Sequence, residues 1–146
     1  MIEFVVYGTP VTQGSKKIAR GRLIDDDPAA LRRWRANIVQ TAREHYQGEP
    51  LGGPIRLTVT FFLKRPKRHY RTGRFADQLR DDAPPVYCDA KPDADKLVRA
   101  VGDALTDAGV WRDDAQAAVL NVRKRYAPDG RTEGAAIRIA PLPTTE

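Results

Sequence analysis

The feature that most constrains the fold is an alternating apolar stretch at residues 55–63, IRLTVTFFL. Its apolar side chains fall at every second position: Ile55, Leu57, Val59, Phe61 and Leu63. Successive side chains of a β-strand point to opposite faces, so this period of two predicts a strand that buries one face in a core. Such a strand needs neighbouring strands and a second layer to cover its apolar face.

Other segments supply those partners. Residues 2–7, 117–126 and 135–140 have strand composition and are bounded by turn residues, whereas the polar stretch 9–22 predicts a loop. A first helix begins at Asp27-Pro28, with Asp27 as its cap, and has its apolar face at Leu31, Trp34, Ile38, Ala42 and Tyr46. A second covers residues 97–106, with its apolar face at Leu97, Val101, Ala104 and Leu105.

This order of elements predicts a single α+β domain over residues 1–146, with a small mixed β-sheet and two main helices packed on it. Residues 64–90 form a long basic loop insertion that we expect to be mobile, because they have four Pro or Gly residues and little periodicity. Residues 141–146 are expected to be a frayed tail.

The distribution of charge favours a nucleic-acid partner. The chain has 25 Lys and Arg against 19 Asp and Glu, a net charge of +6, and residues 64–74 hold no acid. We expect contacts with DNA phosphates from Lys16, Lys17, Lys64, Arg65, Lys67, Arg68, Arg71 and Arg74. Tyr70 and Phe75 are candidates to stack on bases or to act as wedges. Trp34 and Trp111 sit beside apolar spacing and are expected in the core or a dimer interface.

Composition also bears on the compartment. A lone Cys88 excludes an intramolecular disulfide and fits a reducing environment. No apolar run approaches the ~20 residues that span a bilayer, and the first residues lack the pattern of a signal peptide. We therefore expect a cytoplasmic protein without membrane contact.

The chemically dense segment is residues 91–116, where Asp93, Asp95, Asp113 and Asp114 bracket one short helix. Pro92 favours an extended entry to that helix, with Asp93 and Asp95 side by side and Asp95 as the cap. If the chain returns beside this entry, three or four carboxylates converge and repel one another, and a divalent cation relieves the repulsion. Oxygen-only ligands favour Mg²⁺, with Mn²⁺ as a substitute.

Structural roles account for part of the same pattern. Asp95 can simply cap the helix, Asp103 can pair with Arg99 at i+4, and the later pair can be turn residues. From the chemistry alone, metal binding and structural roles are about equally supported. A cap needs only one aspartate, however, so it leaves Asp93 unexplained.

The segment resembles the RusA family of Holliday junction resolvases. The motifs that support this are Asp93-Ala94-Asp95, then Asp103-Ala104-Leu105, then Trp111-Arg112-Asp113-Asp114-Ala115-Gln116. The resemblance implies a Mg²⁺- or Mn²⁺-dependent homodimer that resolves four-way DNA junctions by paired symmetric nicks in recombination and repair. It places the essential metal-binding carboxylates at Asp93, Asp95 and Asp114, with Asp113 as an accessory ligand.

Two departures from the family pattern change the expected chemistry. Lys96 stands where the family often has asparagine, and Arg99 stands at the position of the catalytic lysine. Arginine stays protonated, so Arg99 cannot be a general base, but it can bind the scissile phosphate and stabilise the transition state. Lys96 is a further candidate for DNA contact.

Two rival functions remain open at this point. A general metal-dependent nuclease of the PD-(D/E)xK type is faintly matched by Pro92-Asp93 and Asp114-Ala115-Gln116, but glutamine stands where lysine is usual. A non-catalytic, basic DNA-binding protein with a degenerate site is the other. Cleavage of a four-way junction against linear duplex separates the first from a resolvase, and Mg²⁺-dependent nicking excludes the second.

Overall fold

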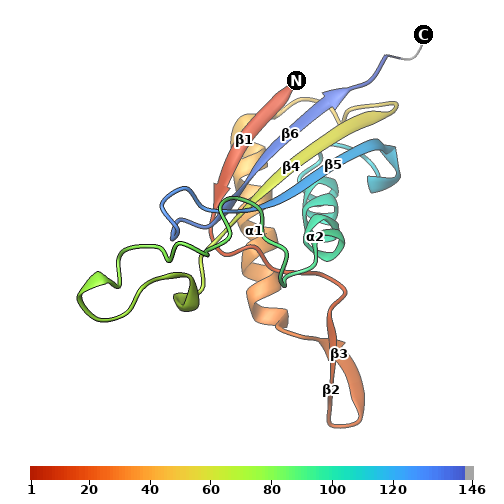
Figure 1. Cartoon of the computed structure of the whole chain (residues 1–146). Helices are drawn as coiled ribbons and strands as arrows, with labels where there is room; N and C mark the ends of the chain where they lie inside the picture. Colours follow the sequence, from red (N-terminus) through yellow and green to blue (C-terminus); the bar gives the residue numbers. More distant parts are fainter. Residues whose placement is uncertain (144–146) are drawn as a thin grey trace.

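The alternating stretch forms the strand β4 (Ile55–Leu63), and its five apolar side chains are buried as predicted. A computed structural model describes residues 1–143 of the chain. In it β4 lies inside a four-stranded sheet with the strand order β1-β6-β4-β5, where β1 is Ile2–Tyr7, β5 is Ala117–Tyr126 and β6 is Gly134–Pro141 (Figure 1). β4 runs parallel to β5 and antiparallel to β6, which is antiparallel to β1, so the sheet is mixed.

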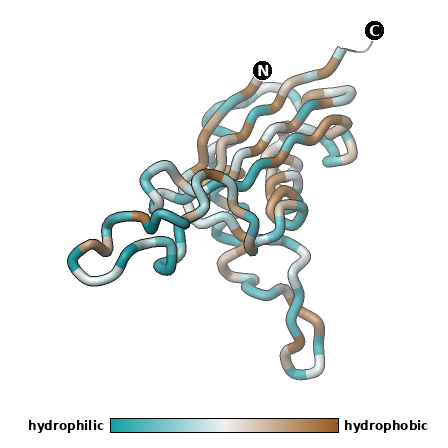
Figure 2. The backbone as a smooth tube through the Cα atoms, in the orientation of Figure 1, coloured by the Kyte–Doolittle hydropathy of each residue, from teal (hydrophilic) through white to brown (hydrophobic). Residues whose placement is uncertain are grey.

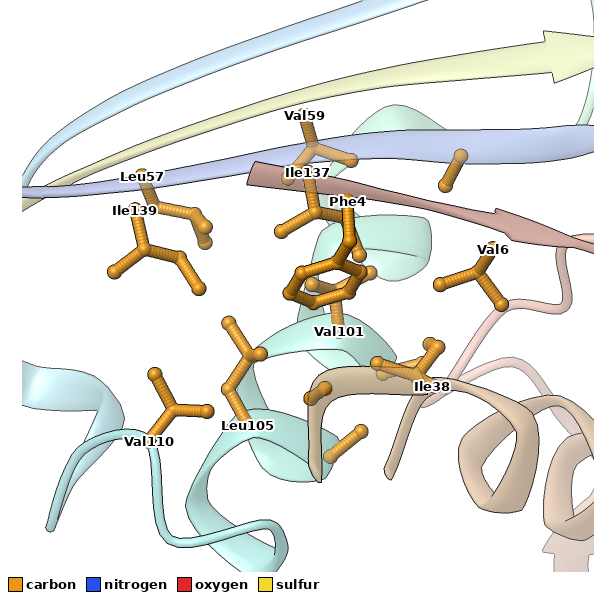
Figure 3. Packing of buried hydrophobic residues seen from close by; sticks show 14 of the residues in the cluster. Phe4, Val6, Ile38, Leu57, Val59, Val101, Leu105, Val110, Ile137 and Ile139 are labelled. Carbon is orange, nitrogen blue, oxygen red and sulfur yellow. The ribbon is translucent and has the colours of Figure 1, made fainter. Parts of the chain in front are cut away.

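Two helices cover one face of this sheet. The helix α1 (Pro28–His45) begins where predicted, because the Asp27 side chain accepts a hydrogen bond of 3.1 Å from the Ala30 N–H. The helix α2 (Ala94–Asp107) is longer than the predicted 97–106. Side chains from both helices meet the inner face of the sheet in one core (Figure 3). The prediction of an α+β domain with a mixed sheet and two helices is therefore confirmed.

Trp34 and Trp111 belong to this core, where both are at most 2% exposed. The Trp111 indole N–H donates to the Thr106 hydroxyl over 2.8 Å. Their burial confirms the core placement predicted for them and removes both rings as surfaces for base stacking.

The prediction of a loop over residues 9–22 holds for residues 9–15 and is wrong for the rest. Part of it forms a β-hairpin of the strands β2 (Lys16–Ala19) and β3 (Arg22–Asp25), which make a separate two-stranded sheet. The turn between them has positive φ at both Arg20 (52°) and Gly21 (75°). This backbone matches the twist of two-residue hairpins, and the polar composition of the segment concealed it. The hairpin projects away from the sheet and helices (Figure 1).

Residues 64–90, called the arm below, project from the end of β4 in another direction (Figure 1). The arm has no long helix or strand, but it contains two short 3₁₀ turns, Lys67–His69 and Gly73–Phe75. The predicted tail 141–146 is only partly described. Pro141 ends β6, Leu142 N–H donates to the Pro54 carbonyl over 2.9 Å, and residues 144–146 lie outside the described residues. Neither α1 nor α2 is long and apolar enough to cross a membrane.

Candidate active site

Asp93 and Asp95 stand at the N-terminus of α2, but not as the spacing predicted. Asp93, with φ −75° and ψ 131°, is the N-cap residue, and the helix already includes Asp95 in its first turn. The extended entry predicted from Pro92 therefore ends at Asp93, and the prediction that Asp95 is the cap is wrong. The Asp95 side chain is exposed and has no hydrogen-bond or ion-pair partner within residues 1–143.

The backbone that leads into Asp93 is fixed by Lys124 on the edge strand β5. Its ammonium group donates to the Ala90 carbonyl over 2.6 Å and to the Pro92 carbonyl over 2.8 Å. The Cys88 N–H in turn donates to the Lys124 carbonyl over 3.1 Å. Lys124 thus ties residues 88–92 to the sheet and sets the position of the carboxylate that follows. Sequence reasoning missed this residue, since nothing local in the chain links it to Asp93.

Asp93 lies among positive charges. Lys91 Nζ is 2.8 Å from one carboxylate oxygen, and Lys96 Nζ is 3.7 Å from the other. The hydrogen bond from Lys91, aided by the charges of Lys91, Lys96 and Lys124, lowers the pKa of Asp93 below its ordinary value. This carboxylate is therefore ionised throughout the neutral range and available as a ligand.

Asp114 follows α2 in the sequence, and its side chain also lies against this helix. A Cβ placed on Gly102 would lie 3.5 Å from Asp114 Cβ and 3.9 Å from its Oδ2, so the Asp114 side chain rests over Gly102 in α2. Burial, together with the neighbouring Asp113 and Asp103 carboxylates, raises the pKa of Asp114 above its ordinary value. Negative charge is thus crowded at this point and not compensated by a nearby cation of the protein.

Asp113 has a structural role in this arrangement. Its side chain accepts a 2.8 Å hydrogen bond from the Ala115 N–H, and the Gln116 side chain accepts one of 3.1 Å from the Asp113 N–H. The two bonds form a capping box on the short 3₁₀ turn Asp114–Gln116. Gln116 also donates to the Leu51 carbonyl over 2.8 Å. The Asp-Asp-x-Gln motif therefore fixes the turn that presents Asp114.

Arg99 is exposed on α2, one turn after Asp95. No hydrogen bond or ion pair joins its guanidinium to another group among residues 1–143, so the suggested pair with Asp103 is absent there. Gly14 passes next to the Arg99 guanidinium, and its φ of +97° is a backbone conformation that favours glycine.

The segment that contains Gly14 is docked on α2 by Gln13. The Gln13 N–H donates to the Lys96 carbonyl over 2.9 Å, and its side-chain amide donates to the Asp103 carboxylate. Arg35 of α1 approaches the same glutamine and pairs with Asp107 over 2.6 Å. Gln13 and Asp103, which sequence reasoning left out of the site, therefore hold the first loop of the chain against the helix that contains Asp95 and Arg99.

Together these contacts define one face of α2. Asp95, Arg99 and Gly102 are spaced by four and three residues and so share a side of the helix, with Asp114 lying over Gly102. Asp95 and Gly102 are about 10 Å apart along the axis. Within residues 1–143 no three His, Cys, Asp or Glu side chains are close enough to hold a metal ion. The predicted convergence of carboxylates is thus incomplete.

The donor chemistry nevertheless fits a hard divalent cation. All the candidates on this face are carboxylate oxygens, the ligands that Mg²⁺ and Mn²⁺ prefer. Burial is the largest cause of the raised pKa of Asp114, and the neighbouring Asp113 and Asp103 carboxylates add like-charge crowding that a cation would relieve. Asp113 is less suited, because its side chain already accepts the Ala115 N–H.

A groove of about 920 Å³ is lined by residues of the arm and of the body of the protein, and its lining includes Lys91 and Pro92, which precede Asp93 in the chain. Its lining combines aromatic and cationic side chains, including Tyr70, Tyr126, Lys64, Lys67, Arg68 and Arg131. A path of this composition is suited to a sugar-phosphate backbone with an exposed base.

One residue predicted to contact DNA departs from that expectation. Arg65 is only 7% exposed, and its guanidinium donates to the carbonyls of Pro84 (2.6 Å) and Pro85 (2.8 Å) at the far end of the arm. It also lies 4.7 Å from the centre of the Tyr126 ring. Arg65 closes the arm on itself and on β5, so its charge is not presented to a ligand.

The aromatic candidates in the arm are also engaged. Arg71 and Arg74 stack on the Phe75 ring, with guanidinium carbons 4.4 and 4.9 Å from its centre. Tyr70 is half-buried, its backbone bridges to Leu79, and its hydroxyl lies against Gly130. Of the charged arm residues that line the groove, Lys64, Lys67 and Arg68 are exposed.

Comparison with known proteins agrees with the motifs. A family model described as endodeoxyribonuclease RusA matches residues 8–139, a range that includes the hairpin, both helices, the arm, β4 and β5. A comparison with curated proteins finds no match. The family predicted from the sequence is confirmed, and with it the class of enzyme, a phosphodiester hydrolase. The chain belongs to the RusA family of Holliday junction endodeoxyribonucleases.

Proposed function

We propose that this endonuclease cuts branched DNA at the exposed face of α2, with Asp93, Asp95 and Asp114 as ligands of Mg²⁺ or Mn²⁺. The observation that carries the proposal is the placement of Asp114 over Gly102, on the side of the helix that presents Asp95 and Arg99. Carboxylates from two motifs thereby lie on the side of α2 that also presents the Arg99 guanidinium. Asp113 would take part only if its capping bond to Ala115 were released.

The roles of the protein side chains follow from their surroundings. When bound, the metal lowers the pKa of water and offsets charge on the phosphate oxygens. Arg99 has no other partner in the described chain and can bind the scissile phosphate in a bidentate manner. Lys96 adjoins Asp93 and supplies a second positive charge at the same end of the helix. Lys124 holds the Asp93 backbone, so it acts as a positioning residue.

The DNA path that we propose runs along the groove beside the arm. Lys64, Lys67 and Arg68 contact phosphates there, while Lys16, Lys17, Arg71 and Arg74 extend the positive surface. Arg65 is excluded, since its guanidinium is buried.

The site assignment is tested with the isosteric substitutions Asp93→Asn and Asp114→Asn. Each removes a charged ligand and leaves the fold intact, so Mg²⁺-dependent nicking of a four-way junction is abolished while junction binding is nearly unchanged. Glu44→Gln, an exposed carboxylate on α1, is the matched control and cuts normally. Wild-type rates in Asp93→Asn or Asp114→Asn would contradict the assignment. A wild-type protein that binds junctions and never nicks at any metal concentration would contradict catalysis altogether.

We further propose that the active form is a homodimer, because a four-way junction has two equivalent strands and a two-fold protein presents two equivalent sites. Sedimentation analysis gives twice the chain mass if this is correct. When the junction is part of a supercoiled plasmid, a dimer makes both nicks before it dissociates, so linear plasmid forms directly. A monomer that accumulates singly nicked circles contradicts the proposal.

A further inference from the structure

The β2–β3 hairpin has a surface composition that the proposed site on α2 does not explain. It stands apart from the four-stranded sheet and projects into solvent (Figure 1). Ile18 is 78% exposed and Leu23 is 69% exposed, although hydropathy along the rest of this part of the chain is mostly low (Figure 2). No other large apolar side chain in strands β1 to β6 is more exposed than Ile18.

The two apolar side chains act as a pair. Ile18 and Leu23 are direct cross-strand partners in the antiparallel register of the hairpin, so their side chains lie on the same face. The tight turn with positive φ at Arg20 and Gly21 fixes that register. A pair of exposed apolar side chains on a projecting two-stranded hairpin has the form of a wedge.

Positive charge lies behind this apolar pair and at the tip of the hairpin. Lys17, Arg20 and Arg22 are exposed, and none of the three has an ion-pair partner within residues 1–143. Lys17 and Arg22 belong to the opposite face of the hairpin, and Arg20 stands at its tip. A ligand that fits both the apolar pair and the cations of the hairpin has an apolar surface with anions beside it. The stacked bases and phosphates of DNA have this composition.

The hairpin is also anchored next to the catalytic face. Gln13, three residues before β2, donates to the Lys96 carbonyl over 2.9 Å, and Gly14 lies under Arg99. A four-residue strand extends about 13 Å, the span of about four base pairs, so the tip reaches DNA that is bound at α2.

We propose that the hairpin is a branch-point wedge: Ile18 and Leu23 insert against the base pairs that flank the crossover, and Lys17, Arg20 and Arg22 contact the adjoining phosphates. This inference rests on the proposed function and names how branched DNA is distinguished from linear duplex. At a branch point the terminal base pairs of each arm are stacked on fewer neighbours, so an apolar pair enters at less cost than in continuous duplex.

The test uses a four-way junction with 2-aminopurine at the branch point, in EDTA so that no strand is cut. Wild-type protein unstacks the reporter and raises its fluorescence. Ile18→Thr/Leu23→Thr retains the charges and a β-branched strand residue but loses the apolar pair. It gives no rise and binds the junction at least about tenfold more weakly, with unchanged affinity for linear duplex.

Two control proteins complete the design. Val5→Thr/Leu120→Thr makes the same exchange at apolar residues of the main sheet that are 43% and 49% exposed, and it behaves as wild type. Ile18→Leu/Leu23→Ile keeps the apolar surface and retains the fluorescence rise, which shows that apolar character at these two positions, and not the exact side chains, produces the signal.

Several outcomes overturn the wedge. The first is that the threonine variant unstacks the reporter as wild type does. The second is that this variant loses affinity for junction and duplex equally, because the hairpin then contacts phosphates without distinguishing branched from linear DNA. Loss of self-association in that variant identifies the hairpin as a contact between two copies, and hairpin-dependent binding to phosphatidylserine vesicles without a reporter signal identifies a lipid ligand. A wild-type protein that cuts junctions without unstacking the reporter overturns only the wedge, whereas failure to bind junctions overturns the proposed function as well.

Discussion

Arg99 illustrates how one side chain limits the chemistry of the site. Its guanidinium stays protonated across the physiological range, and it has no protein partner in the described chain. It can therefore offset charge on the phosphate but cannot remove a proton from water. In the mechanism that we propose, a bound metal and the carboxylates that would hold it would promote loss of the proton from water.

We expect Arg99→Gln to lower the rate of junction cleavage by about 10²-fold, because a positive charge at the scissile phosphate is lost. The shape of the pH–rate profile should stay the same, since arginine does not titrate in the range measured. Arg99→Lys should recover part of the rate. Single-turnover cleavage of a four-way junction across pH provides the measurement. A profile whose limb shifts in Arg99→Gln would assign the residue a proton-transfer role.

At the residue scale, the sequence identified the charged groups but not what holds them. Spacing predicts Asp93 and Asp95 as site residues, the family resemblance adds Asp114, and these assignments stay predictions. Lys124 was not, because it lies 32 residues from the Pro92 carbonyl that it binds, and Gln13 lies 90 residues from Asp103. Such partners are set by tertiary packing, and no local pattern encodes them. For the same reason the spacing could not reveal that Arg65 is buried.

At the element scale, the arm is stabilised by a small buried polar cluster. Arg65 Nη1 lies 3.3 Å from His69 Nδ1, and His69 packs edge-on against Tyr126. Burial, followed by the charges of Arg65 and Arg68, lowers the pKa of His69. Burial and a hydrogen bond with Cys88 raise the pKa of Tyr126 to about 12. Both groups are therefore neutral near pH 7, which suits their position beneath the arm.

This cluster predicts that acid loosens the arm. When the arm opens, His69 regains its ordinary pKa and binds a proton more readily than in the closed form. The closed arm is thus most stable above that ordinary pKa and loses stability as the pH falls below it, until the lowered pKa is passed.

Amide hydrogen exchange provides the measurement. The Arg71 and Arg80 N–H groups donate within the arm to the Gln78 and His69 carbonyls. After correction for intrinsic rates, they should exchange faster at about pH 5.5 than at about pH 7.5. His69→Gln should abolish that difference. Equal protection of wild type at both pH values would show that His69 does not control the arm.

The secondary structure of the sheet followed from the sequence far better than that of the hairpin. β1, β4 and β5 match the predicted bounds, because alternation and buried apolar runs report directly on a core. The hairpin pairs only with itself and leaves Ile18 and Leu23 exposed, so it has no such pattern. α2 also began earlier than predicted, since Asp93, not Asp95, caps it.

At the scale of the whole molecule, positive charge on the arm should set the salt dependence of DNA binding. Neutralising the exposed Lys64, Lys67 and Arg68 to glutamine removes up to three phosphate contacts. The slope of log affinity against log salt should then become shallower by about 2.7.

Junction binding measured from low to moderate salt tests this. The control is the equal charge change at Arg32, Arg33 and Arg56, which are exposed on α1 and on the outer side of β4. It should alter the slope much less. Equal changes in the two proteins would mean that DNA senses only net charge and does not follow the arm.

The position of β6 has a consequence for how the protein is made. β6 follows every other strand in the sequence, yet in the sheet it lies between β1 and β4 and bonds to both. During translation neither β1 nor β4 can form its bonds to β6 until the ribosome has released that strand, so the nascent chain carries open strand edges through most of its synthesis. The emerging protein should therefore depend on chaperones more than a chain whose sheet closes in sequence order, and stalling just before β6 should leave it sensitive to protease.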